Sequence, residues 1–165
     1  MNPVLARQLA TYASYHRDGR NRATHFIGIP MIVFAIFIPL AKVPLAAPWG
    51  VPLDLAIVVF IAAVLFYAWL DRFLGLAMAV AIFPLWWLGV MAAALPGPAA
   101  WGLFIAGFAG GWVFQIVGHV FEGRRPALVD NLVQALIGPL FLVVEVVVAL
   151  GFRRDLAPAI DTKAR

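Results

Sequence analysis

The sequence of 165 residues contains no cysteine, few charged residues and only three histidines. Without cysteine, the chain can form neither a disulfide bond nor a thiolate nucleophile, and no metal can be held by thiolates. Charged residues make up 12% of the chain, and its Lys and Arg residues form no basic stripe interleaved with aromatic residues. Nucleic acid is therefore not an expected partner.

What the sequence has in excess is apolar surface. Hydrophobic residues make up 64% of the chain, and the mean hydropathy is +0.97, whereas a soluble domain is roughly 45–50% apolar. The excess must face lipid, where only helices or closed barrels satisfy the backbone. A barrel needs alternating polar and apolar residues, but the run 56–66 is apolar throughout. The predicted fold is therefore an all-α, polytopic membrane helix bundle.

A single membrane domain is expected over residues 1–165, and it opens with an amphipathic helix over 3–17. Asn2 is a suitable cap for this helix, and Pro3 suits its first position. Four residues at three- and four-residue spacing share one face of it: Leu5, Leu9, Tyr12 and His16. We expect this interfacial helix to lie on the membrane surface.

Membrane spans are predicted for four apolar segments, at about residues 26–41, 53–70, 73–95 and 99–121. A fifth apolar segment, 132–152, contains Gly138-Pro139. Because a Gly-Pro pair tends to break or kink a helix, this segment is either a fifth span or a re-entrant helix.

The positive charges favour the re-entrant alternative. If all five segments cross, the twelve Lys and Arg residues divide seven to five between the two sides. If the fifth segment turns back, eleven lie on the side of the N-terminus and Lys42 alone lies opposite. Positive residues concentrate on the cytoplasmic side, so a cytoplasmic N-terminus is predicted. The high Ala, Gly, Pro and Trp content is typical of a bacterial source, hence the bacterial cell (inner) membrane; a eukaryotic protein would be expected in the endoplasmic reticulum.

Under either topology, His16, His25 and His119 fall near the same membrane face. Gln115, His119 and Glu122 are spaced i, i+4 and i+7, so they share one face of a helix, and Asn21 lies four residues before His25. Imidazole and carboxylate together suit iron, zinc or manganese. The alternative is that each histidine is only a hydrogen-bonded anchor at the membrane interface.

Two further sets of charged residues are candidates for function. Arg124 and Arg125 are either anchors to anionic headgroups or a clamp for a carboxylate, which an arginine binds in bidentate fashion. Glu145 lies in the last apolar segment. A carboxylate inside the membrane is a functional candidate by default, and otherwise it partners an arginine or a polar neighbour.

Two stretches carry a recognisable pattern. The first runs from Tyr12 through His16, Asn21 and His25 to Gly28-Ile29-Pro30. The second runs from Gln115 through Gly118-His119 and Phe121-Glu122-Gly123 to Arg124-Arg125-Pro126, and continues with Asp130-Asn131, Pro139-Leu140-Phe141 and Glu145. These stretches resemble the motifs of the 2-hydroxy fatty acid dioxygenases of fatty-acid alpha-oxidation. The likeness extends from about Leu5 to Phe152, although between Pro44 and Ala100 only the hydropathy matches.

The resemblance implies an iron(II)-dependent dioxygenase that removes one carbon from a 2-hydroxy fatty acid. Its partners would be that fatty acid, dioxygen and membrane lipids, and the acyl chain would lie between helices in contact with the bilayer. The oligomeric state and the chain length of the substrate do not follow from it.

The resemblance also implies roles for individual residues. The iron ligands would be His16, His25 and His119. Glu122 would be either a further ligand or an acceptor that orients an imidazole. Asn21 and Gln115 would support the ligands, and Arg124 or Arg125 would hold the substrate carboxylate.

Two alternatives stay open. In one, His25 and His119 are the axial ligands of a haem held between facing spans. In the other, the protein is a non-enzymatic lipid-binding or scaffold protein whose histidines bind headgroups.

Overall fold

The computed structural model describes residues 2–45, 47 and 53–161, and over these ranges the chain is helical apart from turns and an isolated antiparallel bridge between Pro44 and Asp54. Residues at both ends of the expected domain 1–165, among them Lys163 and Arg165 of the charge argument, lie outside the described residues.

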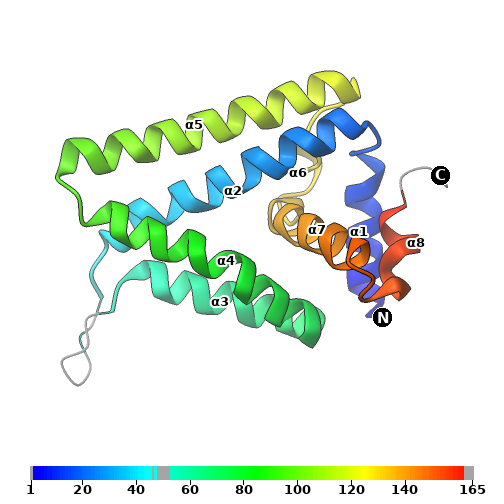
Figure 1. Cartoon of the computed structure of the whole chain (residues 1–165), viewed down its shortest axis with the longest axis horizontal. Coiled ribbons are helices and arrows are strands. Elements are labelled where there is room, and N and C mark those ends of the chain that lie inside the picture. The colour runs from blue at the N-terminus through cyan, green and yellow to red at the C-terminus, as the bar shows by residue number, and fades with distance from the viewer. Residues whose placement is uncertain (1, 46, 48–52, 162–165) are drawn as a thin grey trace.

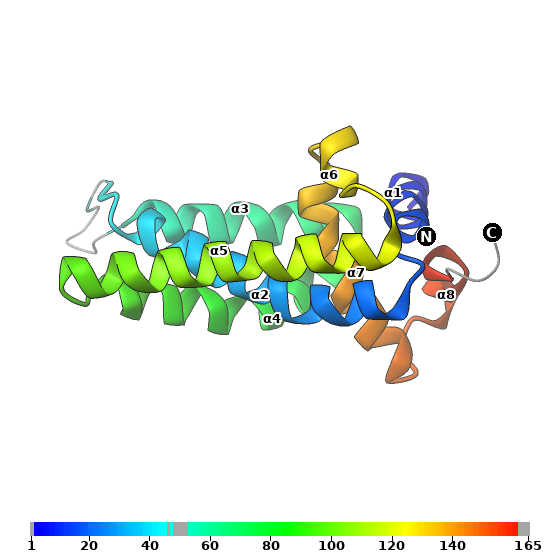
Figure 2. The same cartoon turned by 90° about the horizontal axis from the view of Figure 1, so that it is seen from above.

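Four helices run side by side along the long axis of the molecule, each antiparallel to the next in sequence (Figures 1 and 2). They are α2 (Gly19–Ala41), α3 (Leu55–Leu70), α4 (Arg72–Ala93) and α5 (Gly97–Glu122). Within the described ranges, three of them, α2, α4 and α5, are long and apolar enough to cross a membrane, and α3 is a shorter apolar helix. Their outer faces carry large apolar side chains that are 61–69% exposed: Leu65, Leu76, Val80 and Ile105. Such faces suit lipid rather than water.

The remaining helices gather at one end of these four. They are α1 (Pro3–Ser14), α6 (Ala127–Asp130), α7 (Gln134–Ala149) and α8 (Ala157–Ile160), with a 3-10 turn at Arg154–Leu156. Helix α1 runs across the direction of the long helices in Figure 1, and α7 runs across it in Figure 2. The first and last described segments of the chain therefore lie at the same end.

Helix α1 differs from its prediction in length and in surroundings. Its start is as expected, because the Asn2 side chain accepts a hydrogen bond from the Val4 amide. It ends at Ser14 rather than at residue 17 because the chain turns there to reach Asp18, which caps α2. Leu5 and Leu9 are fully buried, and α1 packs against α7 and α8. The apolar face that we expected to lie on the membrane surface is thus covered by protein.

Helix α7 is continuous through Gly138-Pro139, so the expected interruption is wrong. A Cβ atom at Gly138 would lie 3.0 Å from the Tyr12 hydroxyl and 3.2 Å from Ile29 Cδ1. The glycine is therefore required for close packing of α7 against α1 and α2, and the proline follows without ending the helix. With 16 residues, α7 is about 24 Å long, and it does not double back.

Helices α2 and α5 pack closely because glycines replace side chains along their contact. A Cβ atom at Gly28 would lie 2.7 Å from the Gly111 carbonyl oxygen, and one at Gly111 would lie 2.8 Å from the Gly28 carbonyl. Small residues let helix backbones approach in this way. Helix α2 also begins seven residues before the predicted span at 26, so Asn21 and His25 share one helix face. The contact brings the start of α2 to the end of α5, where the candidate site lies.

Candidate metal centre

The three histidines of the chain meet at the end of the molecule where α1, α2 and α5 converge. His16 lies in the loop after α1, His25 in the second turn of α2, and His119 in the last turn of α5. They are 1%, 2% and 6% exposed, and their ring centroids are 4.6–5.1 Å apart. Residues more than ninety positions apart in sequence thus form one buried cluster, which we call the histidine triad.

Backbone carbonyls determine which ring nitrogens carry a proton. Nδ1 of His16 lies 2.8 Å from the Tyr12 carbonyl oxygen, and Nδ1 of His25 lies 2.8 Å from the Asn21 carbonyl oxygen. A carbonyl can only accept, so both Nδ1 atoms carry the proton and both Nε2 atoms present a lone pair. These two Nε2 atoms lie 3.1 Å apart. Two facing lone pairs repel each other unless a proton or a metal cation lies between them.

The triad has the dimensions of a metal site. Two nitrogens that each lie about 2.1 Å from a shared metal are about 3.0 Å apart when their bonds make a right angle. One ring nitrogen from each of the three histidines lies within 4.8 Å of the other two. Nδ1 of His119 is buried and has no hydrogen-bond partner among the described residues, a cost that a bound ion removes. A buried group of this composition could bind a metal.

The surroundings of His16 oppose a proton as the bridging charge. Burial, and then the neighbouring His25, lowers the pKa of His16 to about 3, so the ring is neutral at physiological pH. The Tyr12 ring stacks on His16 with centroids 3.9 Å apart and planes inclined by 9°. Burial and the nearby Glu145 raise the pKa of Tyr12, which keeps its hydroxyl protonated.

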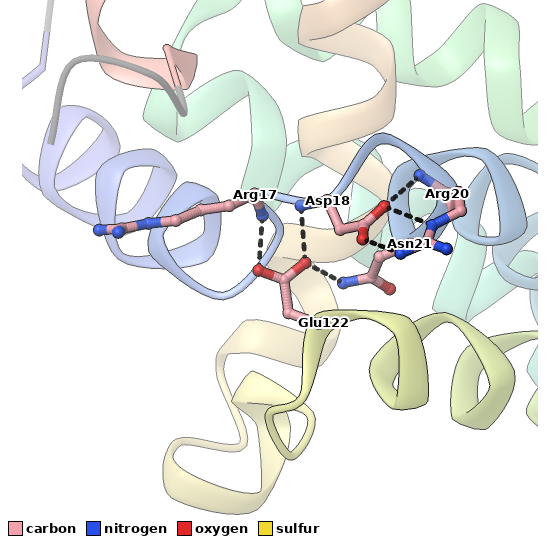
Figure 3. A network of polar contacts seen from close by, with 5 residues as sticks. All are labelled: Arg17, Asp18, Arg20, Asn21 and Glu122. Atoms are coloured by element: carbon pink, nitrogen blue, oxygen red, sulfur yellow. Dashed lines mark hydrogen bonds and ion pairs between the residues drawn. The ribbon is translucent and has the colours of Figure 1, made fainter.

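Glu122 holds the loop that carries His16, and this differs from both roles expected of it (Figure 3). Its Oε1 accepts a hydrogen bond from the Arg17 amide, and its Oε2 accepts bonds from the Asp18 amide and the Asn21 side-chain amide, at 2.9–3.0 Å. The carboxylate therefore faces the start of α2 rather than an imidazole. It clamps the α1–α2 loop onto the end of α5.

Asn21 and Asp18 extend this clamp. Asn21 donates to Glu122 through its side chain, while its backbone carbonyl accepts from His25. The Asp18 side chain accepts from the Arg20 amide and guanidinium, and these bonds lower the pKa of Asp18 to about 2. Asn21 thus connects Glu122 with a triad histidine.

Gln115 lies one helical turn before His119 and is 7% exposed. Its Nε2 atom is buried without a hydrogen-bond partner among the described residues. The structure therefore brings Gln115 close to the triad, but its amide nitrogen bonds to none of the three histidines.

The expected carboxylate clamp of Arg124 and Arg125 is occupied by protein groups. Arg124 donates to the Ser14 carbonyl at 3.1 Å and lies over the Tyr15 ring. Arg125 forms an ion pair with Asp130. Both arginines thus help to attach the end of α5 to neighbouring segments.

Glu145 has an arginine partner that the sequence did not single out. Its buried carboxylate forms an ion pair with Arg22 of α2, whose side chain is 35% exposed. Arg22 had counted only as one of several positive residues near the membrane face. Tyr12 was placed on the same helix face as His16 and at the start of the first motif, but no role at the site was assigned to it.

Comparison with known proteins gives the family of the chain. The sequence profile of the family described as 2-hydroxy-palmitic acid dioxygenase Mpo1-like matches residues 3–150, a range that includes all three histidines. The chain belongs to this family. This Mpo1-like chain is 35% identical over 161 residues to the 2-hydroxy-palmitic acid dioxygenase MPO1 of Saccharomyces cerevisiae, covering 95% of the chain and 87% of the yeast protein. No solved structure matches it.

Proposed function

We propose that this protein is an iron(II)-dependent dioxygenase that shortens 2-hydroxy fatty acids by one carbon within a membrane. The observation that carries the proposal is the pair of unprotonated imidazole nitrogens, 3.1 Å apart in a buried triad. The family, and the activity for which the yeast relative is named, supply the reaction class.

The reaction balances without an external reductant. A 2-hydroxy acid and one dioxygen give the acid shorter by one carbon, carbon dioxide and water, so the substrate supplies all four electrons that dioxygen accepts. His16, His25 and His119 would hold the iron, and the bound iron would supply the redox chemistry between the substrate and dioxygen. With only three protein ligands, the site would remain accessible to both reactants.

The residues of the chain hold this site in shape. The Tyr12 and Asn21 carbonyls fix the tautomers of His16 and His25, so both Nε2 lone pairs point to the same place. Glu122 fixes the loop that carries His16. Burial of the three rings excludes water, which protects a reactive site from side reactions.

Iron is favoured over zinc because the family is named for a dioxygenase and zinc has no redox chemistry. The haem alternative fits poorly, because a porphyrin between His25 and His119 would need the space that the His16 ring fills. A scaffold protein that only binds headgroups has no use for three buried imidazoles that face one another.

In this proposal α2, α3, α4 and α5 cross the membrane, and α1 and α7 lie across their cytoplasmic end. The common position of the first and last described segments supports four crossings rather than five (Figure 1). The concentration of Arg near this end supports the cytoplasmic orientation.

The test is a single-turnover experiment on the purified full chain. The protein is loaded with ferrous iron without air, mixed with 2-hydroxypalmitate and then exposed to air. We expect pentadecanoate in the product extract, with one dioxygen consumed per turnover, and zinc-loaded protein should give none.

Alanine variants of the triad separate the alternatives. Each of His16→Ala, His25→Ala and His119→Ala should lower bound iron and abolish product formation. Iron retained by all three variants would favour the scaffold protein, and a strong Soret band would favour haem.

A further inference from the structure

An apolar cavity of about 480 Å³ lies between α2, α3, α5 and α7. This volume is within the range of small-molecule sites, roughly 300–1,000 Å³. Its walls are almost entirely aliphatic and aromatic, and nothing in the foregoing chemistry uses it.

One end of the cavity adjoins the histidine triad. Tyr12, Ile29 and Gln115 line it, and each lies four residues from a triad histidine: His16, His25 and His119, respectively. Four residues are about one helical turn. A molecule in the cavity therefore has one end within a single layer of side chains of the triad.

The other end is lined by bulky residues. Along α2 the lining extends from Ile29 to Phe37, along α5 from Gln115 to Phe108, and along α3 from Tyr67 to Val59. Eight residues of helix give a depth of about 12 Å. Phe37, Val59 and Phe108 thus lie at the end distant from the triad.

Gln115 is the polar feature that points to a ligand. It lines the cavity, and the residue is only 7% exposed. Its Nε2 atom has no hydrogen-bond partner among the described residues. An unpaired buried amide is costly. A bound molecule that brings an acceptor oxygen would pair this amide and remove the cost.

We propose that this cavity holds the acyl chain of the fatty acid, and that Gln115 donates a hydrogen bond to an oxygen of the 2-hydroxy carboxylate head. The inference rests on the proposed function for the identity of the ligand. Phe37, Val59 and Phe108 then limit the length of chain that fits, and the head group lies beside the triad.

A second apolar cavity, of about 460 Å³, provides an internal control. It lies between α2, α4 and α7 and shares Ile29, Val33, Ile82 and Pro139 with the first. Its lining does not include Tyr12 or Gln115. Ala63 lines only the first cavity, whereas Ala81 lines only the second, and both are half-buried.

The first experiment measures binding of 2-hydroxypalmitate to zinc-loaded protein, by displacement of a fluorescent fatty acid, so that no turnover is required. Ala63→Phe fills the cavity and should weaken binding at least tenfold, whereas Ala81→Phe should change it less than twofold. Equal affinities in both variants, or the reverse order, would overturn the proposal. If the protein has dioxygenase activity but the two variants do not differ in affinity, the acyl chain does not bind in this cavity, while the proposed function is still supported.

A photoreactive palmitate with a terminal diazirine gives a second readout that does not depend on the stability of a variant. Crosslinks to Phe37, Val59 or Phe108 support the assignment. Crosslinks confined to α4 residues such as Ala77 and Ala81 contradict it.

Gln115→Leu tests the role of the amide. It should weaken 2-hydroxypalmitate binding about tenfold, as expected for loss of a hydrogen bond to a charged group. Thermal stability should be unchanged or higher, because the variant removes an unpaired buried group. A lower melting temperature with unchanged affinity would show that Gln115 is only structural.

Discussion

A single carboxylate, that of Glu122, connects segments about one hundred residues apart at the candidate site. Its two oxygens accept three N–H groups from Arg17, Asp18 and Asn21. Two of these residues directly follow His16, and the third carries the carbonyl bound to His25. The position of two triad histidines therefore depends on a residue whose hydrogen bonds go to neither ring, but to Arg17, Asp18 and Asn21.

We expect Glu122→Gln to weaken metal binding while the protein stays folded. Glutamine has one acceptor oxygen, and its NH2 group would face backbone donors. Replacing a residue that supports a ligand typically lowers metal affinity about 10–100-fold, and a chelator competition titration with iron(II) measures this effect.

Asp130→Asn is the matched control. Asp130 also bears a carboxylate, but it pairs with Arg125 and Tyr15 at the surface, where ion pairs contribute about 0–1 kcal/mol. The iron affinity of the Asp130→Asn variant should equal that of the parent protein. If Glu122→Gln behaves like Asp130→Asn, the clamp does not hold the site.

At this scale the sequence revealed the identities but not the contacts. The scarcity of histidine and the i, i+4, i+7 spacing pointed to His119, Gln115 and Glu122. The direction in which the Glu122 carboxylate points depends on the α1–α2 loop, which no local pattern reveals. The partner of Glu145 was missed for the same reason, since Arg22 lies on another helix.

At the scale of elements, the close approach of α2 and α5 depends on glycines. A Cβ atom at Gly118 would overlap Thr24 Oγ1 and Asn21 Oδ1. We expect Gly118→Ala to separate the helix ends, to lower stability by about 1–3 kcal/mol and to reduce iron content. Thermal unfolding in detergent micelles and metal analysis measure the two effects.

Gly102 offers a control on the same helix, because a Cβ atom there meets nothing within 4 Å. Gly102→Ala should leave iron content unchanged and stability unchanged or up to about 1 kcal/mol higher. Equal losses in the two variants would mean that the loss at Gly118 does not come from its contact with α2.

Apolar runs were sufficient to locate α2, α3, α4, α5 and α7, but the ends and breaks of these helices were harder to predict. Helix α2 starts at Gly19, in a polar stretch that hydropathy excludes from a span, because Asp18 caps it and α5 covers it. Gly138-Pro139 has the pattern of a break, yet the glycine is required by contact with Tyr12 and Ile29. Tertiary packing decided both cases.

At the scale of the molecule, the absence of cysteine makes topology directly measurable, because any introduced thiol is unique. Thr11→Cys and Arg154→Cys lie at the triad end, and Leu95→Cys lies at the opposite end of the long helices; all three positions are exposed. We expect the first two to react only with reagents that reach the cytoplasm, and the third only with external reagents. Thr11→Cys and Arg154→Cys on opposite sides would mean that α7 crosses.

The triad takes one ring from the beginning of the chain and another from the end of α5. During synthesis, the His16 ring cannot meet the His119 ring until α2, α3, α4 and α5 have all been made and inserted. In the proposed function, the complete metal site would therefore form only in a chain whose helices have already assembled. Bound metal would thus report complete insertion, and a chain interrupted before His119 would lack one of the three proposed ligands.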